Sequence, residues 1–186
     1  MVTAAPESAL ARLTNRELAT RARRVRLVLT DCDGVLTDGS VDYTEAGETS
    51  KRFSMRDGMG VERLREAGIV TAILTRESSP IVRRRSEKLL MPHHFEGVKD
   101  KAAHIEAIAR QTGSSPDEWA YIGDDVNDLG IIAALDERGL TGAPADAVPE
   151  VLAAVHYRTW KPGGYGAFRE FAEWLLRWRA QSGGEP

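Results

Sequence analysis

The sequence has few of the residues that build several common classes of protein. Its 186 residues include one cysteine, Cys32, which excludes an internal disulfide and a zinc site made of cysteines. No apolar run approaches the roughly 20 residues that a membrane-spanning helix needs. Residues 1–13 contain no apolar segment typical of a secretory signal. We therefore expect a protein of the reducing cytoplasm that does not bind membranes.

The chain also lacks an excess of positive charge. It carries 25 Lys and Arg against 28 Asp and Glu, for a net charge of -3 at pH 7, which argues against a nucleic-acid partner. A basic run over 21–26 has no interleaved aromatic residues, and we interpret it as a solvated surface. The length and a hydrophobic share of 42% predict a single domain, 1–186, with residues 1–20 as an N-terminal extension.

Strand-like and helix-like segments alternate along the chain. We predict buried strands at Val25–Thr30, Ile69–Leu74 and Trp119–Ile122. Amphipathic helices are expected over 60–67, 80–90, 100–110, 126–135 and around 168–178. This alternation predicts an α/β, Rossmann-like parallel sheet with helices on both faces. Segments 41–44 and 49–54 flank a glycine turn, which predicts a small β-hairpin flap, 41–54, after the first strand.

Acidic residues follow two of the predicted strands. Asp31 and Asp33 come after the first strand, and residues two apart in extended chain point the same way. Carboxylates that close repel unless a proton or a cation relieves them. Gly123-Asp124-Asp125 and Asp128 follow the strand 119–122. Carboxylate oxygens that meet at one sheet edge, without His or Cys, predict Mg²⁺.

Two further residues complete a chemical set at this edge. Thr75 follows the strand 69–74 and supplies a hydroxyl, and Lys101 opens a helix and supplies a positive charge. The set suits phosphoryl transfer, with Asp31 as the nucleophile and Asp33 as the acid and then the base. Asp-x-Asp alone is typical of a turn, and Gly-Asp-Asp alone of a helix start, so the joint placement carries the hypothesis. Cys32 is disfavoured as a nucleophile because no His is placed to activate it.

These motifs resemble those of a known superfamily of enzymes. Asp31-Cys32-Asp33-Gly34-Val35-Leu36-Thr37-Asp38-Gly39, Thr75, Lys101 and Gly123-Asp124-Asp125 are similar to the four motifs of the haloacid dehalogenase superfamily, over 27–176. The second aspartate is typical of its phosphatase branch. Segments 53–58, 96–101 and 161–170 resemble the group without a large cap domain, which hydrolyses phosphates of eight- and nine-carbon keto-sugar acids.

The resemblance implies roles for particular residues. Mg²⁺ would be held by Asp31, by Asp124 and by Asp33 through its backbone carbonyl. The implied substrate-binding residues are Asp33, Ser54, Arg56, Asp57, Thr75, Glu77, Arg85, Lys88 and Lys101, and the implied supporting residues are Gly34, Gly123, Asp125 and Asp128. The resemblance also implies a homotetramer whose hairpins pack together and close the site.

The sequence departs from the eight-carbon enzymes at the second motif. They usually read Thr-Gly-Arg, and here it is Thr75-Arg76-Glu77. Glu77 and the segment 81–89 look more like the nine-carbon enzymes that act on 2-keto-3-deoxynononate 9-phosphate, a sialic-acid-type sugar. Arg85 and Lys88 are three apart on one helix face and suit a substrate carboxylate. We therefore favour the nine-carbon acid over 3-deoxy-manno-octulosonate 8-phosphate, an intermediate of lipopolysaccharide synthesis.

Two other functions fit parts of the pattern. A response-regulator receiver also gathers Asp, Thr and Lys at strand ends, but its acceptor Asp lies on a later strand, so the motif order disfavours it. A non-catalytic, regulatory domain that partners a cytidylyltransferase is the main alternative. The intact Asp33 argues against it. Turnover of p-nitrophenyl phosphate with Mg²⁺ separates the phosphatase from both.

Overall fold

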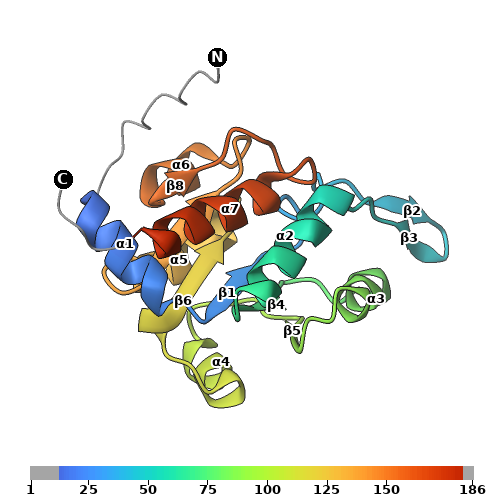
Figure 1. Ribbon diagram of the computed structural model, residues 1–186. Helices are drawn as coiled ribbons and strands as arrows, with labels where there is room; N and C mark the ends of the chain where they lie inside the picture. The colour runs from blue at the N-terminus through green and yellow to red at the C-terminus, as the bar shows by residue number, and fades with distance from the viewer. Residues whose placement is uncertain (1–12, 182–186) are drawn as a thin grey trace.

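The protein is built around one parallel sheet. The structure is a computed structural model that describes residues 13–181. Figure 1 shows the sheet, whose six strands lie in the order β5-β4-β1-β6-β7-β8 and pair in parallel throughout. The strands are β1 (Leu27–Thr30), β4 (Val70–Leu74), β5 (His93–Phe95), β6 (Trp119–Ile122), β7 (Leu140–Ala143) and β8 (Tyr157–Arg158). The predicted α/β class is confirmed.

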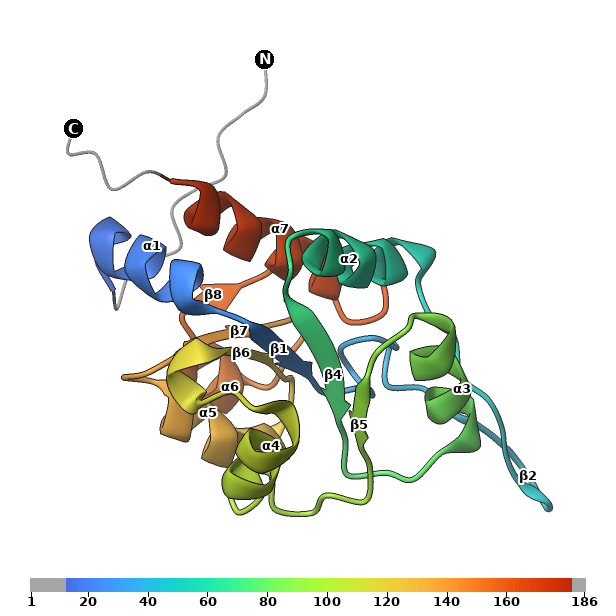
Figure 2. The same cartoon turned by 60° about the horizontal axis from the view of Figure 1, so that its bottom comes forward.

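Helices cover both faces of the sheet, as Figure 2 shows. Successive strand residues point to opposite faces, so Val28 packs with one layer and Leu27 and Leu29 pack with the other. The first layer contains α1 (Asn15–Arg24), α2 (Met55–Glu66) and α7 (Ala167–Ala180). The second contains α4 (Ile105–Thr112), α5 (Leu129–Leu135) and α6 (Pro149–Ala154). Helix α3 (Pro80–Lys88) reaches the first layer through Val82, from the β5 edge.

The hairpin projects away from the sheet (Figures 1 and 2). Strands β2 (Asp42–Thr44) and β3 (Gly47–Ser50) pair antiparallel, with Thr44 opposite Gly47. The connecting turn is therefore only Glu45 and Ala46, shorter than predicted, and Gly47 adopts a φ of 110° just after it. The β-structure ends at Ser50, so 51–54 is a connecting leg and not part of the predicted second strand.

Three helices begin at other residues than predicted; of these, α5 begins at Leu129, after the 3-10 turn Val126–Asp128. Helix α2 starts at Met55 because the Ser54 hydroxyl accepts a hydrogen bond from the Arg56 amide, 3.1 Å away, and caps the helix. The sequence does not indicate this start, because Gly58 and Gly60 lie in the first turns of the helix and glycine has a low helix propensity. Gly60 is needed because a Cβ there would lie 3.0 Å from the Arg169 Cα on α7. Helix α4 starts at Ile105, and residues 101–104 form turns.

Three strands were not predicted, two because they are very short and β7 because it contains a glycine. β5 has three residues directly after Pro92, and β8 has two. β7 contains Gly142, where a Cβ would lie 2.6 Å from the Phe171 ring of α7. Of the predicted N-terminal extension, residues 15–20 belong to α1, and residues 1–12 lie outside the described part of the chain. Within 13–181, no helix is long and apolar enough to cross a membrane.

Candidate active site

Asp31 lies at the carboxyl end of β1, in the middle of the sheet. Its amide donates to the carbonyl of Ile122 over 2.9 Å, which continues the pairing of β1 with β6 past the last strand residue. Its side chain is 8% exposed. Oδ1 accepts a hydrogen bond from the Cys32 amide at 2.6 Å, and Oδ2 accepts one from Lys101 Nζ at 2.6 Å. The sheet and these donors fix the predicted nucleophile in one orientation.

Lys101 is the centre of a buried polar network. Its side chain is fully buried, and Nζ donates to Asp31 Oδ2, to Asp128 Oδ1 at 2.5 Å and to the Tyr121 hydroxyl at 3.0 Å. Tyr121 in turn donates to Asp128 Oδ1 at 2.6 Å. Desolvation alone would lower the pKa of Lys101, but Asp31 and Asp128 raise it overall, so the lysine stays charged. Tyr121 was not predicted, because it lies inside a strand that reads as plain core.

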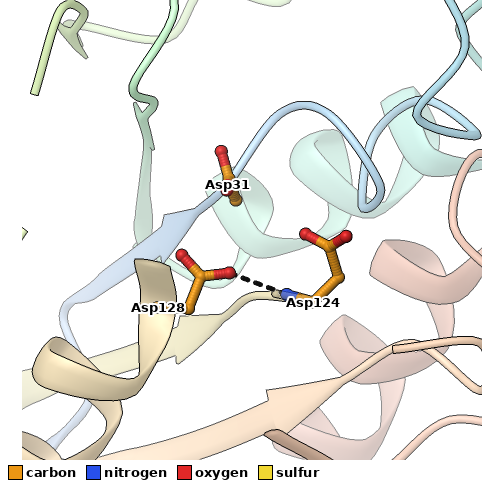
Figure 3. A group of neighbouring side chains, drawn as sticks. All are labelled: Asp31, Asp124 and Asp128. Atoms are coloured by element: carbon orange, nitrogen blue, oxygen red, sulfur yellow. Dashed lines mark hydrogen bonds between the residues drawn. The ribbon is translucent and has the colours of Figure 1, made fainter. Parts of the chain in front are cut away.

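Asp124 is the carboxylate that lacks partners. Figure 3 shows it beside Asp31 and Asp128, and ligand oxygens of the three lie within 4.8 Å of one another. Asp124 Oδ1 is buried and has no hydrogen-bond partner among the described residues. Burial, and then the charges of Asp31 and Asp128, raise the pKa of Asp124 to about 8. Burial also raises the pKa of Asp31 to about 6, against the influence of Lys101.

These features fit a divalent cation. An unpartnered buried oxygen beside a second carboxylate is what a hard cation needs, and a bound cation would favour the ionised forms that burial disfavours. Asp128 is different, because its Oδ2 accepts from the amides of Asp124 (2.8 Å) and Asp125 (3.2 Å) and its Oδ1 from Lys101 and Tyr121. Asp128 therefore positions its neighbours, and Asp31 and Asp124 are the better ligands.

Two glycines allow these carboxylates to come close. A Cβ at Gly34, which has a φ of 81°, would lie 1.9 Å from Asp124 Oδ2, so no larger residue fits there. A Cβ at Gly123 would lie 2.3 Å from Asp128 Oδ2. Asp125 caps the short turn Val126–Asp128, with its Oδ1 accepting from the Val126 amide at 2.7 Å. Gly34 and Gly123 therefore leave room for the carboxylates, and Asp125 stabilises the turn that follows Asp124.

Asp33 lies two residues beyond Asp31 and is partly exposed. Its Oδ1 accepts hydrogen bonds from Lys51 Nζ at 2.6 Å and from Thr37 Oγ1 at 3.3 Å. Sequence reasoning missed Lys51, which is 18 residues away on the leg of the hairpin. The sequence did offer one signal. Lys51 lies two residues before Phe53, which is the first residue of a segment that resembles the family.

Thr75 brings a hydroxyl to the same edge. It directly follows β4 and is buried, and its amide donates to the Phe95 carbonyl at 2.9 Å. Its Oγ1 accepts a hydrogen bond from the Glu77 amide at 3.3 Å. The structure therefore brings the four predicted catalytic residues, Asp31, Asp33, Thr75 and Lys101, to the carboxyl ends of β1 and β4 and to the loop before α4.

The predicted substrate residues differ in burial and in what they contact. Asp57 is buried, and its carboxylate accepts from the amides of Gly166 (3.1 Å) and Arg169 (2.9 Å), so it ties α2 to the start of α7. Arg85 donates to the Ser54 carbonyl at 3.1 Å. Arg56, Glu77 and Lys88 are exposed, and Glu77 makes no ion pair with Lys88. Their roles in binding substrate stay predictions.

The glycine-rich segment 161–166 packs against the loop that carries Asp33. A Cβ at Gly163 would lie 1.9 Å from the Gly34 carbonyl oxygen, and one at Gly164 would lie 2.5 Å from the Asp38 amide nitrogen. The Gly164 amide donates to the Val35 carbonyl at 2.9 Å. This segment therefore supports the loop 33–38 from within the same chain.

Known proteins resemble this chain over most of its length. No family model matches it. It is 39% identical over 162 residues to a 3-deoxy-D-manno-octulosonate 8-phosphate phosphatase from Haemophilus influenzae, covering 87% of this chain and 88% of that one. The cobalt-bound structure of this phosphatase from the same species aligns with a TM-score of 0.81 over 87% of this chain and 93% of that one. This chain belongs to the 3-deoxy-D-manno-octulosonate 8-phosphate phosphatase family.

Family membership confirms the resemblance to the haloacid dehalogenase superfamily. The members of this family are phosphoric monoester hydrolases. A further structure, the enzyme from Moraxella catarrhalis with magnesium, phosphate and the sugar acid KDO, is 35% identical and aligns with a TM-score of 0.80 over 88% of this chain and 92% of that one. The solved relatives thus contain cobalt or magnesium, in agreement with a divalent metal at the acidic cluster.

Proposed function

We propose that this protein is a Mg²⁺-dependent phosphatase that removes the terminal phosphate of a keto-sugar acid through an aspartyl phosphate on Asp31. The observation that carries this proposal is the asymmetry among the buried carboxylates. Asp31 is oriented by Lys101, while Asp124 keeps an unpartnered buried oxygen beside it. A nucleophile held by a cation next to an open ligand position suits attack on phosphorus.

Each residue of the set has a step to perform. Asp31 attacks phosphorus, and Thr75 and Lys101 hold the phosphoryl oxygens as charge builds on them. Asp33 gives its proton to the leaving alkoxide and then takes one from the water that hydrolyses the aspartyl phosphate. Bound Mg²⁺, held by Asp31, Asp124 and the Asp33 carbonyl, supplies positive charge to the phosphoryl group.

The substrate class follows from the relatives. Those described above act, by name, on 3-deoxy-D-manno-octulosonate 8-phosphate. We therefore put this eight-carbon acid first, although Glu77 and segment 81–89 favour the nine-carbon acid in the sequence. The relatives lend no support to that preference. The regulatory alternative loses ground because all four predicted catalytic residues are present and gathered at one sheet edge.

The experiment is a comparison of substrates with and without metal. The wild type should hydrolyse octulosonate 8-phosphate with Mg²⁺ and lose activity in excess chelator, and added Mg²⁺ should restore it. Asp31→Asn is isosteric and should keep the fold while removing turnover. Near-normal turnover by Asp31→Asn, or full activity in chelator, would refute the mechanism. A clear preference for the nine-carbon 9-phosphate would restore the assignment favoured by the sequence.

We also propose the homotetramer implied by the resemblance. Every residue of β2 is exposed, and Tyr43 on it is 69% exposed. A two-stranded hairpin is marginal in water by itself, and packing against other hairpins would stabilise it. Light scattering should give four times the mass of the chain, and an active monomer at assay concentration would contradict the proposal.

A further inference from the structure

Lys51 is a buried cation on the connecting leg of the hairpin. Its side chain is only 2% exposed, whereas that of Asp33, its ion-pair partner, is 24% exposed. The distance from Nζ to Asp33 Oδ1 is 2.6 Å, which is short and typical of a charge-assisted hydrogen bond. Burying an ammonium group is costly unless it is paired. The ion pair with Asp33 offsets this cost for Lys51.

Both donors to Asp33 use the same carboxylate oxygen. Lys51 Nζ and Thr37 Oγ1 each bond to Oδ1, and within residues 13–181 no donor bonds to Oδ2. The carboxylate is therefore held by one oxygen, and the other is left open. This arrangement fixes the rotation of the side chain and reserves Oδ2 for a group that is not part of the chain.

The leg that carries Lys51 is itself fastened on both sides. Glu48, in β3 just after the hairpin turn, accepts a hydrogen bond from the Ser79 hydroxyl at 2.7 Å, and Ser79 caps α3. On the other side of Lys51, Arg52 pairs with Asp38 and donates to the Tyr165 hydroxyl of the glycine-rich segment. Contacts with α3 on one side, and with the loop 33–38 and the glycine-rich segment on the other, therefore hold the chain that carries Lys51.

We propose that Lys51 is a positioning residue for Asp33: its ammonium group holds Oδ1 so that Oδ2 faces the leaving group and then the attacking water. This inference rests on the proposed function, because it takes Asp33 as the acid and base. Proton transfer requires the oxygen within hydrogen-bond reach of the reacting atom, and a misplacement of about 1 Å can cost ~100-fold in rate. Without Lys51 only the longer bond from Thr37, at 3.3 Å, restrains the carboxylate, and both proton transfers slow.

The first test replaces the ammonium group and keeps the stem. Lys51→Met should lower kcat for the sugar-acid phosphate by about 10- to 100-fold, a part of the ~10²–10⁴-fold that acid–base catalysis contributes. KM should change by less than about threefold, because Lys51 does not hold the substrate. Lys51→Arg, which keeps a charged donor, should recover most of the rate. Lys99→Met is the matched control, because it removes an exposed lysine that makes no hydrogen bond or ion pair with Asp33, and it should behave as the wild type.

The second test asks whether Lys51 acts through Asp33. In a double-mutant cycle, Lys51→Met should cost less than about twofold once Asp33→Asn is present, since the group it positions is already lost. Equal costs in the two backgrounds, or an effect on KM and not on kcat, would overturn the inference and make Lys51 a substrate-binding or structural residue. Wild-type rates for Asp33→Asn itself would instead refute the proposed role of Asp33, so the two failures are distinct. Thermal unfolding of each variant excludes loss of the fold as the cause.

Discussion

The sheet edge that carries the buried carboxylates differs from the rim, by which we mean the exposed residues Arg56, Glu77 and Lys88. At the edge, the side chains of Lys101 and Asp128 are fully buried and pair with each other, whereas the buried Asp124 Oδ1 has no partner among the described residues. The residues proposed for phosphoryl transfer are thus held by burial within one chain, whereas the rim residues predicted to bind the sugar are exposed.

The difference has an energetic side. Buried ions lose the stabilisation that water gives them, and only the attraction among them offsets this loss. Removing one member therefore leaves a buried charge without a partner. An exposed side chain keeps its water, and its removal costs little stability. Mutations at the edge should therefore change both stability and activity, and mutations at the rim should change only the choice of substrate.

The largest effect is expected from Lys101→Met. The change leaves Asp31 and Asp128 facing each other without a cation, and should lower the free energy of unfolding by about 3–5 kcal/mol in the absence of metal. In the proposed mechanism it also removes a positive charge beside the phosphoryl oxygens, so kcat should fall by about 10²–10³-fold. Urea unfolding and steady-state kinetics measure the two quantities, with Lys99→Met as the control. A variant as stable and as active as the wild type would contradict the buried network as the basis of the site.

Much of the edge could be predicted from the sequence, because a short buried strand followed by acids is a local signal. Asp31, Asp124 and Lys101 each lie directly at the end of a strand or in a turn, and parallel strands bring such ends together. Contacts across long separations carry no such signal. Lys51 reaches Asp33 only through the path of the hairpin leg, and Asp57 meets α7 through contacts 109 and 112 residues away.

The same limit applies to Asp57, which is buried outside the sheet edge. Asp57 is a predicted substrate residue because its segment resembles the family, and in the structure both its carboxylate oxygens accept hydrogen bonds from the start of α7. A motif records that a residue matters and does not say whether the reason is binding or packing. Short strands such as β5 and β8 were missed for a physical reason too, since two or three residues have no periodicity to detect.

A smaller and more selective effect is expected at the rim from Glu77→Ala. If Glu77 accepts a hydrogen bond from a sugar hydroxyl, its loss should cost about 1.5–3 kcal/mol, or roughly ten- to a hundred-fold in kcat/KM for the sugar-acid phosphate. Turnover of p-nitrophenyl phosphate should barely change, because that substrate has no remote hydroxyls. Equal losses on both substrates would mean that the Glu77 side chain supports the catalytic site itself and says nothing about the sugar.

The smallest effect concerns how metal binding to the buried edge depends on pH. Burial raises the pKa of Asp124 to about 8 and that of Asp31 to about 6, from an ordinary value of 3.8. The folded protein without metal therefore holds more protons than the unfolded chain between about pH 4 and pH 8, and its stability falls as pH rises through that window. A cation needs both carboxylates ionised, so at low pH it must displace protons in order to bind.

The expected result is a stabilisation by Mg²⁺ that grows with pH. At a concentration about 100 times its Kd, Mg²⁺ should add about 2.7 kcal/mol at pH 8.5, which corresponds to a rise in Tm of roughly 5–11 °C for a chain of this size. At pH 5.5 the same concentration should raise Tm by much less. Thermal unfolding with and without Mg²⁺ across this range measures both values. Asp124→Asn should remove most of the pH dependence, because it takes away the carboxyl with the more strongly raised pKa. An increase in Tm that is equal at pH 5.5 and pH 8.5 would mean that the cation binds outside the buried carboxylates, at groups that are already ionised.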